Sequence, residues 1–177
     1  MDDGHLLHDA QRGNEAAFLD LYQRYRTPVF RFAWRLTGST AAAEDVTHDC
    51  FLALLEGAAF DDRRASLRTY LFGVARFLAF KRLRLADRET EESETAGNAH
   101  DPFQELLEAE RSELVARAVA ALPPLQREAL ILFEYEELSL EEIAQVAGVD
   151  IGAVKARLSR ARESLRRKLA PCVERSC

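Results

Sequence analysis

Residues 138–162 read LSLEEIAQVAGVDIGAVKARLSRAR, and their pattern is the most informative in the chain. Ser139 followed three residues later by Glu142 is typical of a capping box, in which each side chain accepts from the other residue's backbone N–H. Gly148 favours a tight turn, because glycine adopts positive φ without steric cost. Asp150 is placed to cap a following helix. The pattern therefore predicts a short helix, a glycine turn and a second helix, which together form a helix-turn-helix.

The second helix of this motif is amphipathic and basic. Its apolar residues recur every three or four positions, as expected for a buried stripe: Ile151, Val154, Leu158, Ala161, Leu165 and Leu169. Seven basic residues and one acidic residue lie between 151 and 170, a net charge of +6. A merely solvated basic helix would show the same charge. The capping box, the turn glycine and the basic face together favour a helix that enters the major groove of DNA.

The rest of the chain is also helical in pattern. It has 8 Gly and 5 Pro in 177 residues, and Ala, Leu, Glu and Arg, all good helix formers, dominate. The spacing of apolar residues predicts helices over about 4–12, 15–38, 41–56, 67–86, 103–121, 125–135 and 151–169, with the short motif helix before the last. Pro28 lies within the second of these, so we expect a kink or a break there.

Charge divides the chain into two parts. The net charge is −6, but residues 63–84 contain seven basic residues and no acidic one. Residues 87–113 carry ten acidic residues against two basic ones. Two basic blocks separated by an acidic one indicate two anion-binding surfaces. We predict an all-α protein of two small helical domains, 1–86 and 105–177, joined by a flexible acidic linker over 87–104.

Several functional classes find no support in the sequence. It has no signal-peptide pattern and no apolar run long enough for a membrane span, so we expect a cytoplasmic protein that does not associate with membranes. No glycine-rich phosphate loop or Ser-His-Asp set indicates an enzyme, and we expect no cofactor or metal. His5 and His8 are interpreted as a surface pair, and Cys50 as a core residue. Cys172 and Cys177 are expected to be free thiols.

The chain resembles the extracytoplasmic-function (ECF) sigma factors of bacterial RNA polymerase over nearly its whole length. In the C-terminal half the resemblance is to the family's fourth conserved region, and it rests on LP at 122–123, RE at 127–128, LSLEEIA at 138–144 and VKARLSRAR at 154–162. In the N-terminal half it is to the second region, and it rests on AF at 17–18, LY at 21–22, Tyr25, AEDVTHDCF at 43–51 and LRTYLFGVAR at 67–76. The resemblance implies a region-two helical bundle followed by a region-four helix-turn-helix.

The resemblance also implies a role for each surface. The protein would bind core RNA polymerase, recognise the minus-thirty-five and minus-ten promoter elements and promote DNA opening, without catalysing a reaction itself. Docking on the clamp helices of the largest subunit would use Glu44, Asp45, His48, Asp49 and Leu52. The minus-ten element would be captured by Phe60, Arg63, Arg64, Arg68, Tyr70, Arg76, Phe77 and Lys81. The minus-thirty-five element would be contacted by Asp150, Ala153, Lys155, Arg157, Ser159, Arg160 and Arg162. Region four would contact the flap of the second-largest subunit, and an anti-sigma factor is an implied partner.

Some positions depart from the family's usual pattern. His48 stands where the family often has Gln, Tyr70 where it has Trp, Phe77 and Lys81 where it has Asn and Asp, and Ala153 where it has Thr. The promoter sequence is therefore not transferable from relatives. Two other functions fit parts of the pattern: a dimeric helix-turn-helix regulator that acts without polymerase, and a sigma mimic that sequesters an anti-sigma factor. In the free protein the two domains are expected either to be separate or to pack together with their DNA-binding surfaces hidden.

Overall fold

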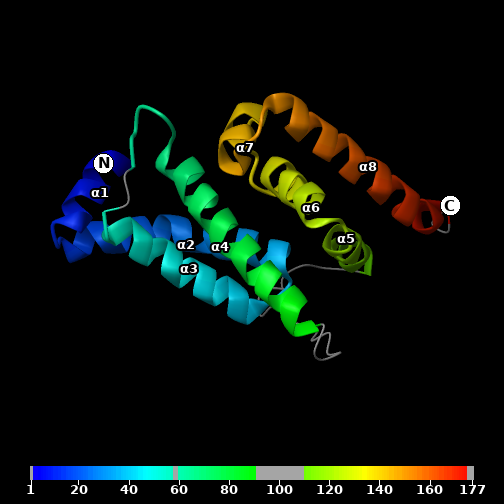
Figure 1. Cartoon of the computed structure of the whole chain (residues 1–177), viewed down its shortest axis with the longest axis horizontal. Helices are drawn as coiled ribbons and strands as arrows, with labels where there is room; N and C mark the ends of the chain where they lie inside the picture. Colours follow the sequence, from blue (N-terminus) through cyan, green and yellow to red (C-terminus); the bar gives the residue numbers. More distant parts are fainter. Residues whose placement is uncertain (1, 58–59, 91–109, 175–177) are drawn as a thin grey trace.

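The structure, a computed structural model, describes residues 2–57, 60–90 and 110–174, and these residues form helices and connecting turns without a β-strand. Four helices form an N-terminal unit and the remaining helices form a C-terminal unit, and the fourth helix, α4 (Leu67–Thr90), lies on the side of the N-terminal unit that faces the C-terminal unit (Figure 1). Among these residues, no helix has both the length and the apolar character needed to cross a membrane.

The N-terminal unit is a bundle of helices with clear end signals. Its helices are α1 (Asp3–Gln11), α2 (Glu15–Thr37), α3 (Thr40–Leu55) and α4 (Leu67–Thr90). The Asn14 side chain accepts from two backbone N–H groups at the start of α2, and Ser39 does the same for one at the start of α3. Gly38 ends α2 with φ of 70°, a conformation that a side chain at this position would disfavour.

Of the kink or break expected at Pro28, the break does not occur: α2 is one continuous helix of 23 residues. A proline inside a helix removes one backbone hydrogen bond and crowds the preceding turn. Here Leu21 lies before Pro28, and Val29 and Phe32 lie after it, and all three are buried in the same core. Burial of this continuous apolar stripe outweighs the local cost of the proline.

The C-terminal unit contains the predicted helix-turn-helix. Its elements are α5 (Glu110–Ala120), α6 (Pro124–Leu130), the π-helical turn η2 (Ile131–Tyr135), α7 (Leu140–Ala147) and α8 (Ile151–Glu174). Both bonds of the capping box are present: the Ser139 N–H donates to Glu142 Oε2 at 2.8 Å, and the Glu142 N–H donates to Ser139 Oγ at 3.1 Å. Gly148 has φ of 66°, and the Ala153 N–H donates to Asp150 Oδ1 at 2.7 Å. The cap, the turn and the second cap are confirmed.

Three predicted element boundaries were wrong. The segment 125–135 is not a uniform α-helix, because its second half is the π-helical turn η2. Helix α4 continues to Thr90, past the predicted end at residue 86, since no Gly or Pro interrupts it. Helix α8 runs to Glu174 rather than to residue 169. Most of the predicted linker, and the predicted helical residues 103–109, lie outside the described residues.

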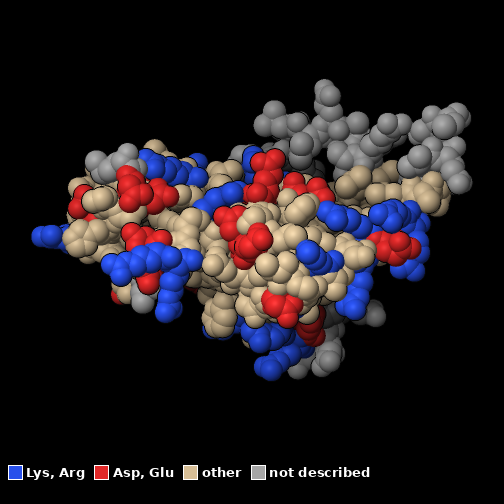
Figure 2. Space-filling model, turned by 90° about the horizontal axis from the view of Figure 1, so that it is seen from above, with Lys and Arg blue, Asp and Glu red and all other residues tan. Residues whose placement is uncertain are grey.

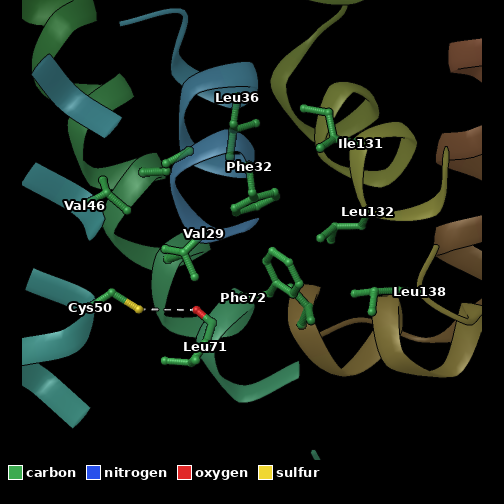
Figure 3. Packing of buried hydrophobic residues seen from close by; sticks show 14 of the residues in the cluster. Val29, Phe32, Leu36, Val46, Cys50, Leu71, Phe72, Ile131, Leu132 and Leu138 are labelled. Carbon is green, nitrogen blue, oxygen red and sulfur yellow. Dashed lines mark hydrogen bonds between the residues drawn. The ribbon is translucent and has the colours of Figure 1, made fainter. Parts of the chain in front are cut away.

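The two units share one hydrophobic core. Phe32 of α2 and Phe72 of α4 meet edge to face, with ring centroids 5.4 Å apart. The C-terminal unit packs on these rings along a boundary that we call the seam. On its other side lie Ile131 and Leu132 of η2 and Leu138 of the following turn, and Leu132 points toward the two rings (Figure 3). The structure therefore shows the two units packed together, as in one of the two arrangements expected for the free protein, but the predicted DNA-binding residues Lys155, Ser159 and Arg160 are exposed rather than hidden.

Candidate nucleic-acid and polymerase interfaces

The outward face of α8 carries the exposed part of the predicted minus-thirty-five set. Lys155, Ser159 and Arg160 are exposed and recur at helical spacing, and Asp150 is exposed at the N-terminal end. Ala153 is half-buried. Lys and Arg side chains gather over the part of the molecule where α8 lies (Figure 2). These side chains are therefore accessible to solvent in the packed structure.

Arg157 and Arg162, the other members of this set, have carboxylate partners. The Arg157 side chain is only 17% exposed, and its Nη1 lies 3.9 Å from Oε2 of the buried Glu128. Arg162 Nη2 donates to Glu134 Oε1 at 3.3 Å, and its guanidinium lies over the Phe133 ring. The two side chains are thus held against the C-terminal unit itself, whereas Lys155 and Arg160 project from it.

The predicted minus-ten residues begin with an aromatic pair. The rings of Phe60 and Tyr70 meet at 5.5 Å between centroids and 61° between planes, and both side chains are half-buried. Burial, with a smaller contribution from Cys50, raises the pKa of Tyr70. Arg63 and Arg64, three and four residues after Phe60, are exposed, and Arg64 Nε lies 3.7 Å from the Asp61 carboxylate. The arrangement offers partly accessible rings for stacking and nearby cations for a phosphate backbone.

The remaining minus-ten residues lie along α4 and divide between two directions. Phe77 is 62% exposed and Lys81 is exposed. Arg68 and Arg76, in contrast, extend to the C-terminal unit: Arg68 pairs with Glu136 at 3.6 Å, and Arg76 Nε donates to Glu128 Oε1. The structure therefore does not bring all eight residues onto one open surface.

The predicted polymerase-docking residues share one face of α3. Glu44, Asp45, His48 and Leu52 are exposed, and Asp49 is half-exposed. Arg82 of α4 lies 3.2 Å from the Asp45 carboxylate and 4.0 Å from that of Asp49, so one cation partly neutralises this acidic face.

Sequence reasoning missed three charged residues that organise these surfaces: Arg82, Glu128 and Glu136. Burial raises the pKa of Glu128, and the nearby Arg76 and Arg157 act in the opposite direction. Burial likewise raises the pKa of Glu136, opposed by arginines that include Arg35 and Arg68. Their pairing could not be read from a local pattern, because each partner lies far away in the sequence. The described residues contain no group of three His, Cys, Asp or Glu side chains placed to hold a metal ion.

Comparison with known proteins identifies the family of the chain. The model of Sigma-70 region 2 matches residues 21–89, and that of Sigma-70, region 4 matches residues 112–165. The chain is 31% identical to the RNA polymerase sigma factor YlaC of Bacillus subtilis, over 85% of this chain and 90% of that protein. It is 30% identical to the ECF RNA polymerase sigma factor SigC of Mycobacterium tuberculosis, over 90% of this chain and 87% of that protein. The chain belongs to the ECF RNA polymerase sigma factors.

Solved structures of the family show the same fold. The sigma factor RpoE in complex with the anti-sigma factor NepR, from Bartonella quintana, has a TM-score of 0.73 and 27% identity, and the match covers 86% of this chain and 96% of that one. CnrH in complex with the cytosolic domain of CnrY has a TM-score of 0.70 and 25% identity, and the match covers 96% of this chain and 97% of that one. In this ECF sigma factor, α1–α4 therefore contain region 2 and α5–α8 contain region 4, and the chain is an alternative transcription initiation factor.

Proposed function

We propose that this sigma factor recognises the minus-thirty-five element with the outward face of α8, formed by Lys155, Ser159 and Arg160. The observation that carries the proposal is that these side chains are exposed on a helix whose N-terminal end is fixed by the Asp150 cap. A rigid helix with projecting basic and hydroxyl groups can contact base edges and phosphates together. Arg157, paired with Glu128, would position α8 in the packed form rather than contact DNA.

Region 2 would contact the minus-ten strand and the polymerase. The Phe60–Tyr70 pair, with Arg63 and Arg64 three and four residues after Phe60, would receive bases of the opened minus-ten strand, because aromatic rings stack on bases without strong sequence preference. The acidic α3 face would dock on basic residues of the polymerase clamp helices. Charge complementarity of this kind guides encounter and excludes wrong partners.

The remaining expectations belong to the same proposal. The protein would act in the cytoplasm as a binding and positioning factor without catalytic activity, with core polymerase performing the chemistry. The similar protein RpoE was solved in complex with the anti-sigma factor NepR, and CnrH in complex with the cytosolic domain of CnrY. The first complex supports an anti-sigma factor as a partner of this chain also.

The test is transcription by purified core polymerase on fragments of the source genome, with and without this protein. We expect initiation that requires the protein and weakens in a Lys155→Ala/Arg160→Ala variant, since one base contact is worth about 1–3 kcal/mol. Arg167→Ala is the matched control, because Arg167 lies further along α8 beside Glu163. If the protein bound duplex DNA but not core polymerase, a conventional regulator would replace this proposal, and binding to neither would favour the sigma mimic.

Docking is tested separately with Glu44→Gln/Asp45→Asn. This variant should lose affinity for core polymerase and keep its affinity for duplex DNA, because the α3 face is not part of α8. Glu15→Gln, which neutralises an exposed acidic residue in the first turn of α2, is the control for loss of negative charge away from α3. Unchanged polymerase affinity in the double variant would exclude the α3 face as the docking surface.

A further inference from the structure

Glu128 in region 4 is a buried carboxylate on the inner side of α8, the helix with the exposed basic face. It lies in α6 and has no exposed surface. Helix α6 packs on α8, and Nη1 of Arg157 lies 3.9 Å from Glu128 Oε2. The Arg157 side chain is 17% exposed, so most of it is withdrawn from the surface of α8.

Charge, rather than a hydrogen bond, holds Arg157 at this carboxylate. Glu128 Oε1 accepts from Arg76 Nε, whereas Oε2 accepts no hydrogen bond from the part of the chain that the structure describes. Attraction between opposite charges is stronger in a buried site than at a surface, because less water screens it. Burial raises the pKa of Glu128, and the two arginines act in the opposite direction because they stabilise its charged form.

The position of Arg157 on α8 places it next to the outward face. It follows Lys155 by two positions and precedes Arg160 by three, and residues three apart are neighbours on the surface of a helix. Lys155 and Arg160 are both exposed. A guanidinium on a long side chain is well suited to bind phosphate. Released from Glu128, Arg157 would therefore reach a phosphate beside the groove that its two neighbours face.

Arg162 shows that a carboxylate partner alone does not withdraw an arginine. Arg162 donates to Glu134 at 3.3 Å, but the two side chains are 42% and 51% exposed. Exposed ion pairs contribute little to stability, so a DNA phosphate can displace Glu134 from Arg162. The same exchange at Arg157 would leave the fully buried Glu128 with one cation fewer, which is costly because water cannot replace it.

We propose that Glu128 is a positioning residue of the duplex-binding face: it holds Arg157 against α6, so that α8 presents Lys155 and Arg160 to DNA without a third arginine or lysine between them. The inference rests on the proposed function and adds a determinant of its specificity. A further phosphate contact would strengthen binding to all sequences about equally. By withholding Arg157, Glu128 keeps this sequence-independent contribution small, and base contacts account for a larger share of the affinity of α8.

The salt dependence of duplex binding tests the proposal in the full-length protein. Binding to a mixed-sequence duplex is measured by fluorescence anisotropy at several salt concentrations. The slope of log affinity against log salt counts the phosphate contacts, at about 0.9 for each. Glu128→Gln keeps the side-chain shape and removes the charge, so the slope should steepen by about 0.9 as Arg157 gains a phosphate. Glu113→Gln removes a carboxylate from an exposed pair with Arg117 within α5 and should leave the slope unchanged.

Two further variants identify the cation responsible. Arg157→Met keeps an apolar stem and should leave the slope of the otherwise unsubstituted chain unchanged, because the native Arg157 contacts no phosphate. Glu128→Gln/Arg157→Met should return to the slope of the unsubstituted chain. That result would exclude Arg76, which also loses its partner in Glu128→Gln, as the source of the new contact. Circular dichroism confirms the fold of each variant.

Three results would overturn the proposal: an unchanged slope in Glu128→Gln, a slope that stays steep in the double variant, or a slope shallower by about 0.9 in Arg157→Met. The last comparison decides the question even where Glu128→Gln does not fold. Failure of the proposed function is a separate outcome, in which Lys155→Ala/Arg160→Ala keeps the full slope of the unsubstituted chain. The Glu128→Gln comparison would still decide whether Glu128 withholds Arg157 from DNA.

Discussion

Replacement of Leu132 by alanine tests whether the two regions form one cooperative unit. Leu132 is fully buried in η2 and points toward Phe32 and Phe72 across the seam (Figure 3). The change deletes the equivalent of three methylene groups, worth about 2.5 kcal/mol in transfer free energy. The cavity left behind raises the expected loss in the free energy of unfolding to about 3–5 kcal/mol. For a chain of this size the melting temperature should fall by roughly 10 °C.

The position of Trp34, the single tryptophan, makes the assay decisive. Trp34 lies in α2 of region 2, whereas Leu132 lies in region 4. The fluorescence of Trp34 therefore reports the unfolding of region 2 when the substitution is in region 4. In urea, Leu132→Ala should lower the midpoint measured by fluorescence and the midpoint measured by circular dichroism together. Leu54→Ala, an equally buried change within region 2, is the control for the size of the effect. An unchanged fluorescence midpoint, with helix lost in two steps, would refute the reasoning.

Three further predictions concern single residues. Ser139→Ala removes one half of the capping box and should lower the free energy of unfolding by about 1 kcal/mol in chemical denaturation; a change within error would show that the cap is unnecessary. Gly73→Ala should raise it by about 0.5–1 kcal/mol, because a helical glycine is unfavourable and an added Cβ meets no atom within 4 Å; a loss would reveal crowding in α4. The third concerns Glu136, whose burial raises its pKa above the ordinary value of 4.5. Its contribution to stability is therefore full below pH 4.5 and is lost as the pH rises through the folded-state pKa. The stability of the unsubstituted chain relative to Glu136→Gln, measured by urea unfolding across this range, should increase as the pH is lowered, and a flat difference would contradict the assignment.

The local signals in the sequence predicted local structure well. The capping box at Ser139, the left-handed turn at Gly148 and the cap at Asp150 each depend on residues within four positions of one another, and all three are confirmed. The burial of Cys50 followed from the periodicity of α3 and is also confirmed. In each case the interaction lies within one turn or one helix, so the residue pattern contains the information.

Features that depend on distant contacts were not predictable in this way. The π-helical turn forms where Ile131 and Leu132 are both drawn into the shared core, and its sequence resembles that of an ordinary helix. The pairing of Arg157 with Glu128 joins residues from two separate helices, so the sequence could not distinguish Arg157 from the exposed basic residues around it. The roles of the individual site residues in binding DNA and polymerase stay predictions.

The buried thiol of region 2 is a built-in probe of how often this region opens. Cys50 is fully enclosed between α3 and α4, its Sγ donates to the Leu71 carbonyl at 3.6 Å (Figure 3), and burial raises its pKa to about 12. Alkylating reagents react with the thiolate, so the side chain is inert while the bundle is folded. With Cys172 and Cys177 changed to serine, each alkylation event marks one opening of region 2. Where alkylation is faster than reclosing, the labelling rate therefore measures how often the native bundle opens.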